Sequence, residues 1–179
     1  MDAVGVADGA AVADLGAGGG WFTVRLARRV GPNGIVYAED VQPEMIEAIR
    51  RRVEREGLTN VRTIRGTATD PRLPPGALDA VLMVDIYNEL EDSVTLLRNV
   101  AKALKPRGRL GIIEYKADGL GPGPGPEDRV DEQRVLADAA RAGFVLQRRE
   151  TFLRYQYMLV FGTAGRDGRT SAPAPGAPR

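Results

Sequence analysis

The residues best suited to chemistry in this chain are an acid and a run of small residues, Asp14-Leu15-Gly16-Ala17-Gly18-Gly19-Gly20. Glycines at alternate places let the backbone turn tightly, and they leave no side chain between the backbone and a ligand. A short apolar segment precedes the run and a segment with helical apolar spacing follows it, which predicts a strand, a loop and a helix. Free N–H groups at the start of such a helix face the same pocket. The stretch therefore predicts a site for a nucleotide-like ligand, with a carboxylate beside it.

The order of the glycines separates two classes of ligand. A dinucleotide-binding loop needs glycine at its first, third and sixth places, and the sixth place here is Trp21. A dinucleotide also brings a pyrophosphate, which needs a bare helix N-terminus. An acid followed by glycines at alternate places instead resembles the first motif of the class I S-adenosylmethionine-dependent methyltransferases. S-adenosylmethionine has no phosphate but carries an ammonium and a sulfonium, so carboxylates beside the loop are useful.

A second candidate carboxylate, Asp40, follows the apolar run at 35–39. A carboxylate at the end of a second strand can accept two hydrogen bonds from a ribose diol. Its neighbour Glu39 competes for this role, and a solvated loop acid or a helix cap is the structural alternative. The resemblance favours Asp40, because the family's acid is followed by Pro-Glu-Met, here Pro43-Glu44-Met45. The resemblance also places the acid matching Asp14 close to the methionine ammonium, whereas residue chemistry alone equally allows a buried acid that holds the loop.

After the third predicted strand comes Gly66-Thr67-Ala68. Family members often carry an acid at the second of these places, where it contacts the adenine amino group. Here that place is Thr67, a departure from the pattern, although its hydroxyl and the backbone N–H of Ala68 can still hydrogen-bond adenine. Asp70 competes as the missing acid, and an ordinary turn is the structural alternative. The cofactor-binding residues predicted from these motifs are Asp14, Gly16, Ala17, Gly18, Gly20, Asp40, Val41, Thr67, Ala68 and Asp85.

Polar residues gather again after the predicted strand at 78–84, in Asp85-Ile86-Tyr87-Asn88-Glu89-Leu90. The chain resembles small bacterial methyltransferases in this stretch and in Asp70-Pro71-Arg72-Leu73-Pro74, and the place of Asn88 is commonly histidine in them. Asparagine can position a substrate, but it cannot act as a base near neutral pH. For Asn88 and Glu89, a helix cap and a first-turn acid are the structural alternative. The predicted catalytic residues are Asp85, Asn88 and Glu89.

Composition limits the chemistry further. The chain has 179 residues, a net charge of +1, no cysteine and no histidine. Disulfides, zinc–thiolate sites and cysteine nucleophiles are therefore impossible, and a general base must be Asp, Glu, Tyr, Lys or water. Nothing in the sequence requires a metal. No apolar run has the length of a membrane span and no signal peptide is recognisable, so we expect a cytoplasmic protein without a membrane or nucleic-acid partner.

Apolar periodicity and turn residues predict the elements that must position these residues. Strands are expected at 11–15, 35–39, 61–65, 78–84, 109–115, 144–150 and 156–161, and helices at 20–30, 42–57, 91–104 and 127–142. This order predicts an α/β fold with a Rossmann-like, doubly wound, seven-stranded sheet. It is mostly parallel with an antiparallel last strand, because the final connection is too short for a crossover. Residues 1–10 are expected to be flexible, and Met45 and Met83 are interpreted as core.

The resemblance covers roughly residues 11–162 and implies methyl transfer from S-adenosylmethionine to a small-molecule acceptor. The predicted organisation is a methyltransferase domain at 1–162, with the lid helices that precede the first strand in the family short or missing, and a disordered tail at 163–179. The Gly- and Pro-rich stretch 119–126 is expected to cover the site as a semi-rigid flap. Two alternatives remain open, a non-catalytic S-adenosylmethionine-binding module and a nicotinamide-dependent oxidoreductase.

Overall fold

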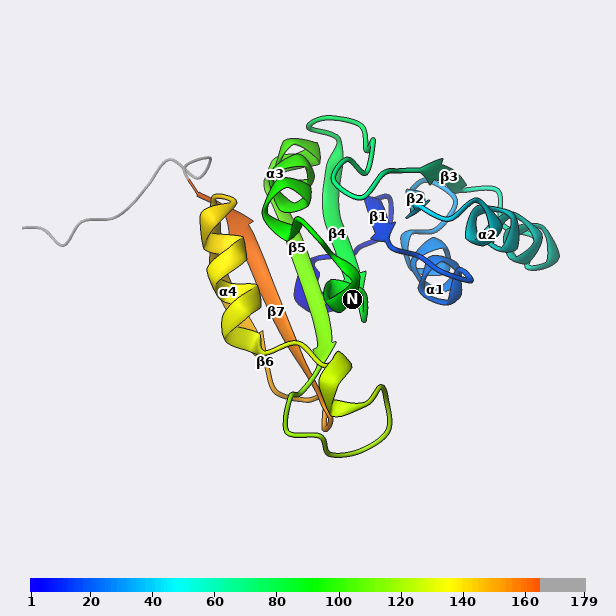
Figure 1. The fold of residues 1–179 in the computed structure, drawn as a ribbon. Helices are drawn as coiled ribbons and strands as arrows, with labels where there is room; N and C mark the ends of the chain where they lie inside the picture. The colour runs from blue at the N-terminus through cyan, green and yellow to red at the C-terminus, as the bar shows by residue number, and fades with distance from the viewer. Residues whose placement is uncertain (165–179) are drawn as a thin grey trace, which may run out of the picture.

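The computed structural model describes residues 1–164, so all but the first two residues of the predicted tail at 163–179 lie outside the described residues. Seven strands form a single sheet in the order β3-β2-β1-β4-β5-β7-β6 (Figure 1). Their bounds are β1 Ala11–Leu15, β2 Ile35–Asp40, β3 Val61–Arg65, β4 Leu78–Val84, β5 Leu104–Tyr115, β6 Phe144–Glu150 and β7 Gln156–Thr163. The first five strands are parallel, and β7 is antiparallel to both β5 and β6. The predicted fold class is confirmed.

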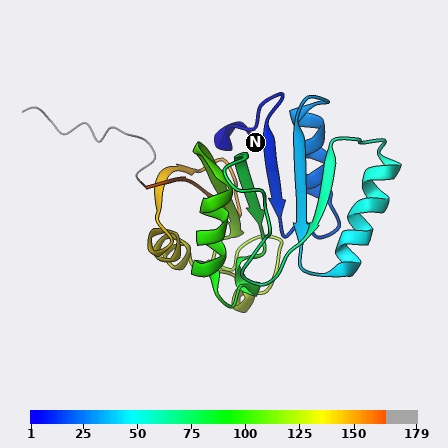
Figure 2. The same cartoon turned by 90° about the horizontal axis from the view of Figure 1, so that it is seen from above.

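Helices cover both faces of the sheet (Figure 2). Helices α1 (Trp21–Val30) and α2 (Pro43–Arg55) pack on one face, and α3 (Ser93–Ala103) and α4 (Glu132–Arg141) pack on the other. Successive strand residues point to opposite faces, so Val12 joins the core under α1 while Ala13 joins the core under α3. Strand β4 is buried on both faces, as its apolar run predicts. Among the described residues, no helix is long and apolar enough to cross a membrane.

The strand order creates a crevice between β1 and β4. From β1 the chain moves outward to β2 and β3, and it then returns to the other side of β1 to build β4 and β5. At such a switch point the loops that follow neighbouring strands diverge, which leaves an opening at the carboxyl ends of the strands. Open α/β sheets bind their ligands in this opening.

The first ten residues are ordered by packing, so the prediction that they are flexible is wrong. Asp2–Val4 forms a short 3-10 helix, and Val4 and Val6 are buried in the core beneath α1. A Cβ atom at Gly111 of β5 would come within 2.5 Å of the Val4 side chain, so Val4 fills the space that this glycine leaves open. Small side chains made the segment look unstructured, but two valines at alternate positions suffice to anchor it.

Several predicted boundaries also shift. Helix α3 begins at Ser93 because Asp92 caps it through the N–H of Thr95 at 3.0 Å, and it ends at Ala103. Strand β5 begins at Leu104 rather than 109, with an irregularity in which 105–108 have no register partner on β4. Helix α4 begins at Glu132 rather than 127, because Asp131 caps it through the N–H of Gln133 at 2.7 Å. Strand β7 continues to Thr163, beyond the predicted start of the tail.

We expect Val4→Ala to lower the free energy of unfolding by about 1.5–3 kcal/mol, because it removes two buried methyl groups and leaves a cavity against Gly111. Urea unfolding measures this change. The control is Ala7→Ser, at an exposed position of the same segment, which should stay within about 0.5 kcal/mol of the wild type. Equal stability of the two variants would show that the segment is not part of the core.

Candidate active site

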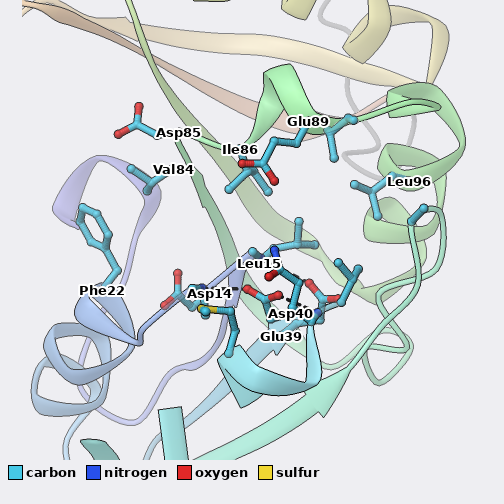
Figure 3. Close-up of a pocket in the computed structure, with 18 of the residues that line it drawn as sticks. Asp14, Leu15, Phe22, Glu39, Asp40, Val84, Asp85, Ile86, Glu89 and Leu96 are labelled. Atoms are coloured by element: carbon cyan, nitrogen blue, oxygen red, sulfur yellow. Dashed lines mark hydrogen bonds between the residues drawn. The ribbon is translucent and has the colours of Figure 1, made fainter. Parts of the chain in front are cut away.

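A cavity of about 450 Å³ opens at the switch point, beside the carboxyl ends of β1, β2 and β4. Residues from the segments 14–22, 39–45, 67–68 and 84–96 line it. The cavity therefore brings together the four motifs that the sequence analysis singled out, which lie far apart along the chain (Figure 3). A cavity of this size suits a ligand as large as a nucleoside.

The glycine loop lies against the cavity with its backbone. Gly16 and Gly18 have φ angles of 68° and 51°, in the left-handed region that favours glycine. A Cβ atom at Gly18 would meet no other heavy atom within 4 Å, so this position faces open space. Gly20 caps α1, and its own Cβ would lie 3.4 Å from the Ile49 side chain of α2. Gly20 is thus placed outside the cavity, while Ala17 and Gly19 line it.

Asp14 lies at the end of β1 with 3% of its surface exposed. Its Oδ2 accepts a hydrogen bond of 2.6 Å from the Thr23 hydroxyl, so the carboxylate holds the first turn of α1 in place. Burial raises the pKa of Asp14 to about 6, and the charge of Asp40 acts in the same direction. Asp14 therefore has both features considered above, a structural contact to the loop–helix junction and a place in the cavity wall.

Asp40 and Glu39 are both buried at the end of β2, and they accept hydrogen bonds from different residues of the glycine loop. Asp40 accepts from the N–H of Gly18 through Oδ2 and from the N–H of Gln42 through Oδ1, both at 2.9 Å. Glu39 accepts from the N–H of Gly16 at 3.3 Å. Burial raises the pKa of Glu39 to about 8, with a further contribution from the charge of Asp40. Asp40 ties the glycine loop to β2 through Gly18, and Glu39 supports the same loop two residues earlier, through Gly16.

The connection after β3 contributes Thr67 and Ala68 to the cavity wall. The Thr67 hydroxyl accepts from the N–H of Asp70 at 3.0 Å, which closes a local turn. Asp70 is exposed and accepts from the N–H of Arg72 at 2.8 Å, so the competing acid is engaged away from the cavity. Val41 also lines the cavity, and so does Met45, which was interpreted as core, while Met83 is fully buried as predicted.

The turn after β4 supplies the opposite wall with Asp85 and Glu89. Asp85 has a φ of 53°, which is unusual for a residue other than glycine. Both of its carboxylate oxygens accept from Nε2 of Gln156 at 3.1 Å, and partial burial raises the pKa of Asp85. Asn88 is exposed and lies outside the cavity lining, so the structure does not bring it together with the other two predicted catalytic residues.

Sequence reasoning missed two kinds of site residue. Trp21 and Phe22, at the start of α1, line the cavity, and their rings make an edge contact with centroids 4.6 Å apart. Glu114 of β5 lies behind the turn after β4 and accepts from two of its backbone N–H groups at 2.9 Å. A signal for Glu114 existed, because an acid directly after the apolar pair Ile112-Ile113 in a buried strand needs a partner.

The stretch 119–126 does not reach the cavity, because none of its residues is among those that line it. It is held instead by Arg129, whose side chain is 2% exposed. The guanidinium donates to the carbonyl oxygens of Lys116, Leu120 and Pro124 at 2.9–3.1 Å. The expected flap is therefore an exposed loop beside the end of β5 and the start of β7, held through its backbone by Arg129 (Figure 1).

The charged side chains of the cavity wall are all acidic among the described residues. Among the described residues that line it there are six acids and no lysine or arginine. They are Asp14, Glu39, Asp40, Asp85, Glu89 and Glu91. A wall of this kind favours a ligand that carries positive charge and disfavours a pyrophosphate.

A doubly wound sheet of this strand order, with a glycine loop at its switch point and an acid ending the next strand, defines the class I S-adenosylmethionine-dependent methyltransferases. Comparison with known proteins agrees. A family model described as a methyltransferase domain matches residues 12–108. The chain belongs to this methyltransferase-domain family.

Individual relatives are similar over part or most of their length. The ubiquinone/menaquinone biosynthesis C-methyltransferase UbiE of Pasteurella multocida (strain Pm70) is 32% identical over 123 residues, which are 68% of this chain and 46% of that protein. A demethylmenaquinone methyltransferase of Geobacillus sp. (strain WCH70) is 29% identical over 114 residues, 64% of this chain and 49% of that protein. The chain thus spans about half the length of the curated relatives it matches.

Among solved structures, a SAM-dependent methyltransferase from Aquifex aeolicus superimposes with a TM-score of 0.87 at 29% identity, covering 91% of this chain and 87% of that one. A putative type 11 methyltransferase from Sulfolobus solfataricus, at 22% identity and a TM-score of 0.72, covers 90% of this chain and 88% of that one. It shares the fold.

The buried carboxyl groups predict a dependence of stability on pH. The pKa of Glu39 is raised from 4.5 to about 8, so between these values the folded protein keeps a proton that the unfolded chain releases. The free energy of unfolding should therefore fall as the pH rises through this window, by at most about 1.4 kcal/mol per pH unit for one group. Asp14, with a pKa of about 6, and Glu114, with a pKa of about 7, act in the same direction.

Urea unfolding of the ligand-free protein across this window tests the prediction. Glu39→Gln cannot ionise and should flatten the fall, most clearly near the upper end of the window. A matched control is Glu44→Gln, an exposed acid at the start of α2 that should leave the slope unchanged. A slope of the same size in Glu39→Gln and wild type would contradict the raised pKa of Glu39.

Proposed function

We propose that this chain binds S-adenosylmethionine in the cavity at the switch point and transfers its methyl group to a small-molecule acceptor. The observation that carries the proposal is the hydrogen bond between Asp40 and the N–H of Gly18 at the cavity edge. It presents a buried carboxylate and a bare stretch of backbone side by side. The residues fit the cofactor, because the open space at Gly18 leaves room for close approach and the acid-only wall matches a cation without phosphate.

Each part of the cofactor has partners in the wall. Asp40 would accept hydrogen bonds from the ribose hydroxyls, since each of its oxygens has a lone pair beyond the one its backbone donor uses. Thr67 and Ala68 border the place for adenine, and Val41 supplies an apolar surface there. Asp14 lies beside the glycine loop, where it would face the methionine ammonium. The proposal thus uses all three loops that follow β1, β2 and β3.

S-adenosylmethionine supplies a methyl group that its sulfonium already activates, so the protein's task is alignment and shelter from water. Asp85, Glu89 and Glu91 are the titratable groups of the wall that follow β4. The raised pKa of Asp85 brings its proton exchange closer to neutral pH, which suits a group that accepts a proton from the acceptor. No histidine or cysteine exists in the chain to take this role.

The acceptor proposed here has an apolar body. Five apolar side chains line the cavity, those of Trp21, Phe22, Val84, Leu90 and Leu96. Trp21 is 49% exposed, which leaves its ring available to a ligand. Relatives named for ubiquinone, menaquinone and demethylmenaquinone methylation point the same way, toward a ring-bearing acceptor. Calorimetric titration with S-adenosylhomocysteine and with NADH, followed by methylation assays on ring-bearing acceptors, distinguishes this function from an oxidoreductase and from a non-catalytic binding module.

Asp40→Ala should weaken S-adenosylhomocysteine binding roughly tenfold to hundredfold, since each lost hydrogen bond to a charged group costs about 1.5–3 kcal/mol. Isothermal titration calorimetry measures the affinity, and circular dichroism checks the fold. Asp70→Ala is a matched control, because Asp70 also follows a strand at the same edge but does not line the cavity. Unchanged affinity in Asp40→Ala would remove Asp40 from the ribose role.

Gly18→Val should abolish S-adenosylhomocysteine binding, because the branched side chain would fill the open space beside the loop. Gly57→Val is the control. Gly57 has a similar φ of 64° and also faces open space, but it lies at the end of α2 away from the cavity. Both variants carry similar backbone strain, so loss of binding in Gly18→Val alone would isolate the steric effect. Equal binding by both folded variants would refute the proposed position of the ligand.

A further inference from the structure

The backbone of Asp85 adopts a positive φ of 53°, which is uncommon for residues other than glycine. Asp85 and Arg72 are the residues other than glycine with positive φ among those the structure describes. Asp85 stands directly after β4, and its N–H donates to the carbonyl of Ile113 on β5 at 2.9 Å. A strained residue persists only where its surroundings over-determine it, and such residues gather at functional sites. The contacts that keep Asp85 in this conformation therefore indicate which role the turn after β4 has.

Two side chains from other strands hold this turn. Oε1 of Glu114 accepts from the N–H groups of Ile86 and Tyr87, both at 2.9 Å, and Glu114 is 4% exposed. Nε2 of Gln156, the first residue of β7, donates to both carboxylate oxygens of Asp85 at 3.1 Å. One contact fixes the backbone that follows Asp85, and the other fixes its side chain. Together they leave the turn little freedom.

We propose that Glu114 and Gln156 are positioning residues, which hold Asp85 in its strained conformation so that its carboxylate forms part of the cavity wall. This inference rests on the proposed function. Neither residue lines the cavity, whereas Asp85 does, so their effect on a ligand must pass through the turn. A buried carboxylate in the sheet is costly unless its hydrogen bonds compensate, and the Glu114 carboxylate accepts its hydrogen bonds from this turn.

The geometry predicts different tolerances at the two positions. Both N–H groups converge on one oxygen of Glu114, so the amide oxygen of Glu114→Gln can accept the same two bonds. Glu114→Ala removes the acceptor entirely. At the other position, Gln156→Ala removes the donor to Asp85, and Asp85→Gly removes the carboxylate while its glycine adopts the positive φ without strain. These variants distinguish an effect on the backbone conformation of the turn from an effect on the position of the Asp85 carboxylate.

A double-mutant cycle tests whether Gln156 acts through Asp85. Gln156→Ala should weaken S-adenosylhomocysteine binding about three- to tenfold in the wild-type background and have no effect in the Asp85→Gly background. Calorimetry and the fluorescence of Trp21, the single tryptophan and a residue of the cavity wall, report binding. Gln147→Ala is the matched control, since Gln147 is an exposed glutamine on β6. A loss of equal size in both backgrounds would overturn the positioning role.

A second readout is independent of any ligand. Amide hydrogen exchange at Ile86 and Tyr87 should speed up in Glu114→Ala and remain slow in Glu114→Gln. Unchanged exchange in Glu114→Ala would refute the part assigned to Glu114, whether or not the protein binds S-adenosylhomocysteine. If the wild type fails to bind S-adenosylhomocysteine, the proposed function is wrong, and the positioning role proposed for that function falls with it. If the wild type binds and Gln156→Ala binds equally well, the inference about Gln156 alone is wrong.

Discussion

Carboxylates near the carboxyl ends of the strands accept hydrogen bonds from the backbone of the loops that form the cavity, and the rest of the site depends on this interaction. Parallel strands end at the same edge of a sheet, so the loops that leave them carry N–H groups without a ladder partner. Asp40 satisfies such a group in the glycine loop, and Glu114 satisfies two in the turn after β4. The loops can then diverge at the switch point and still keep a defined shape.

Placing carboxylates at this edge of the sheet has an electrostatic cost. Burial raises the pKa of Glu39 to about 8 and that of Asp14 to about 6, and the nearby charge of Asp40 acts in the same direction, whereas the hydrogen bonds that the two groups accept lower these pKa values. A pyrophosphate would add negative charge to this wall, whereas an ammonium and a sulfonium would offset it. The charge of the wall therefore explains in physical terms why this glycine loop suits a cationic nucleoside. It also links ligand binding to stability, because a cation that binds only the folded protein stabilises it.

Two irregular segments are held in place by a few buried side chains. In the Gly- and Pro-rich loop, Arg129 donates to three carbonyl oxygens that have no place in the sheet ladder. In the N-terminal segment, Val4 packs into the space above Gly111. Composition alone predicts that both segments are flexible or movable, because glycine, proline and small residues dominate them. Composition indicates how much conformational freedom the backbone has locally, and a contact with a residue distant in the sequence can remove that freedom.

The sequence by itself determined the order and type of the elements, the doubly wound sheet and the three loops that meet at the cavity. These features depend on the local periodicity of apolar residues and on the spacing of Asp14, the glycines and Asp40 along the chain. Both can be read from the sequence. Only the tertiary structure decided that Gln156 holds Asp85, 71 positions away, and that Asn88 lies outside the cavity. The Gln156 contact exists because β7 is inserted beside β5 and brings its first residue to the end of β4. Pairing between distant strands is set by the packing of the whole sheet, and no local pattern encodes which polar side chains will meet there.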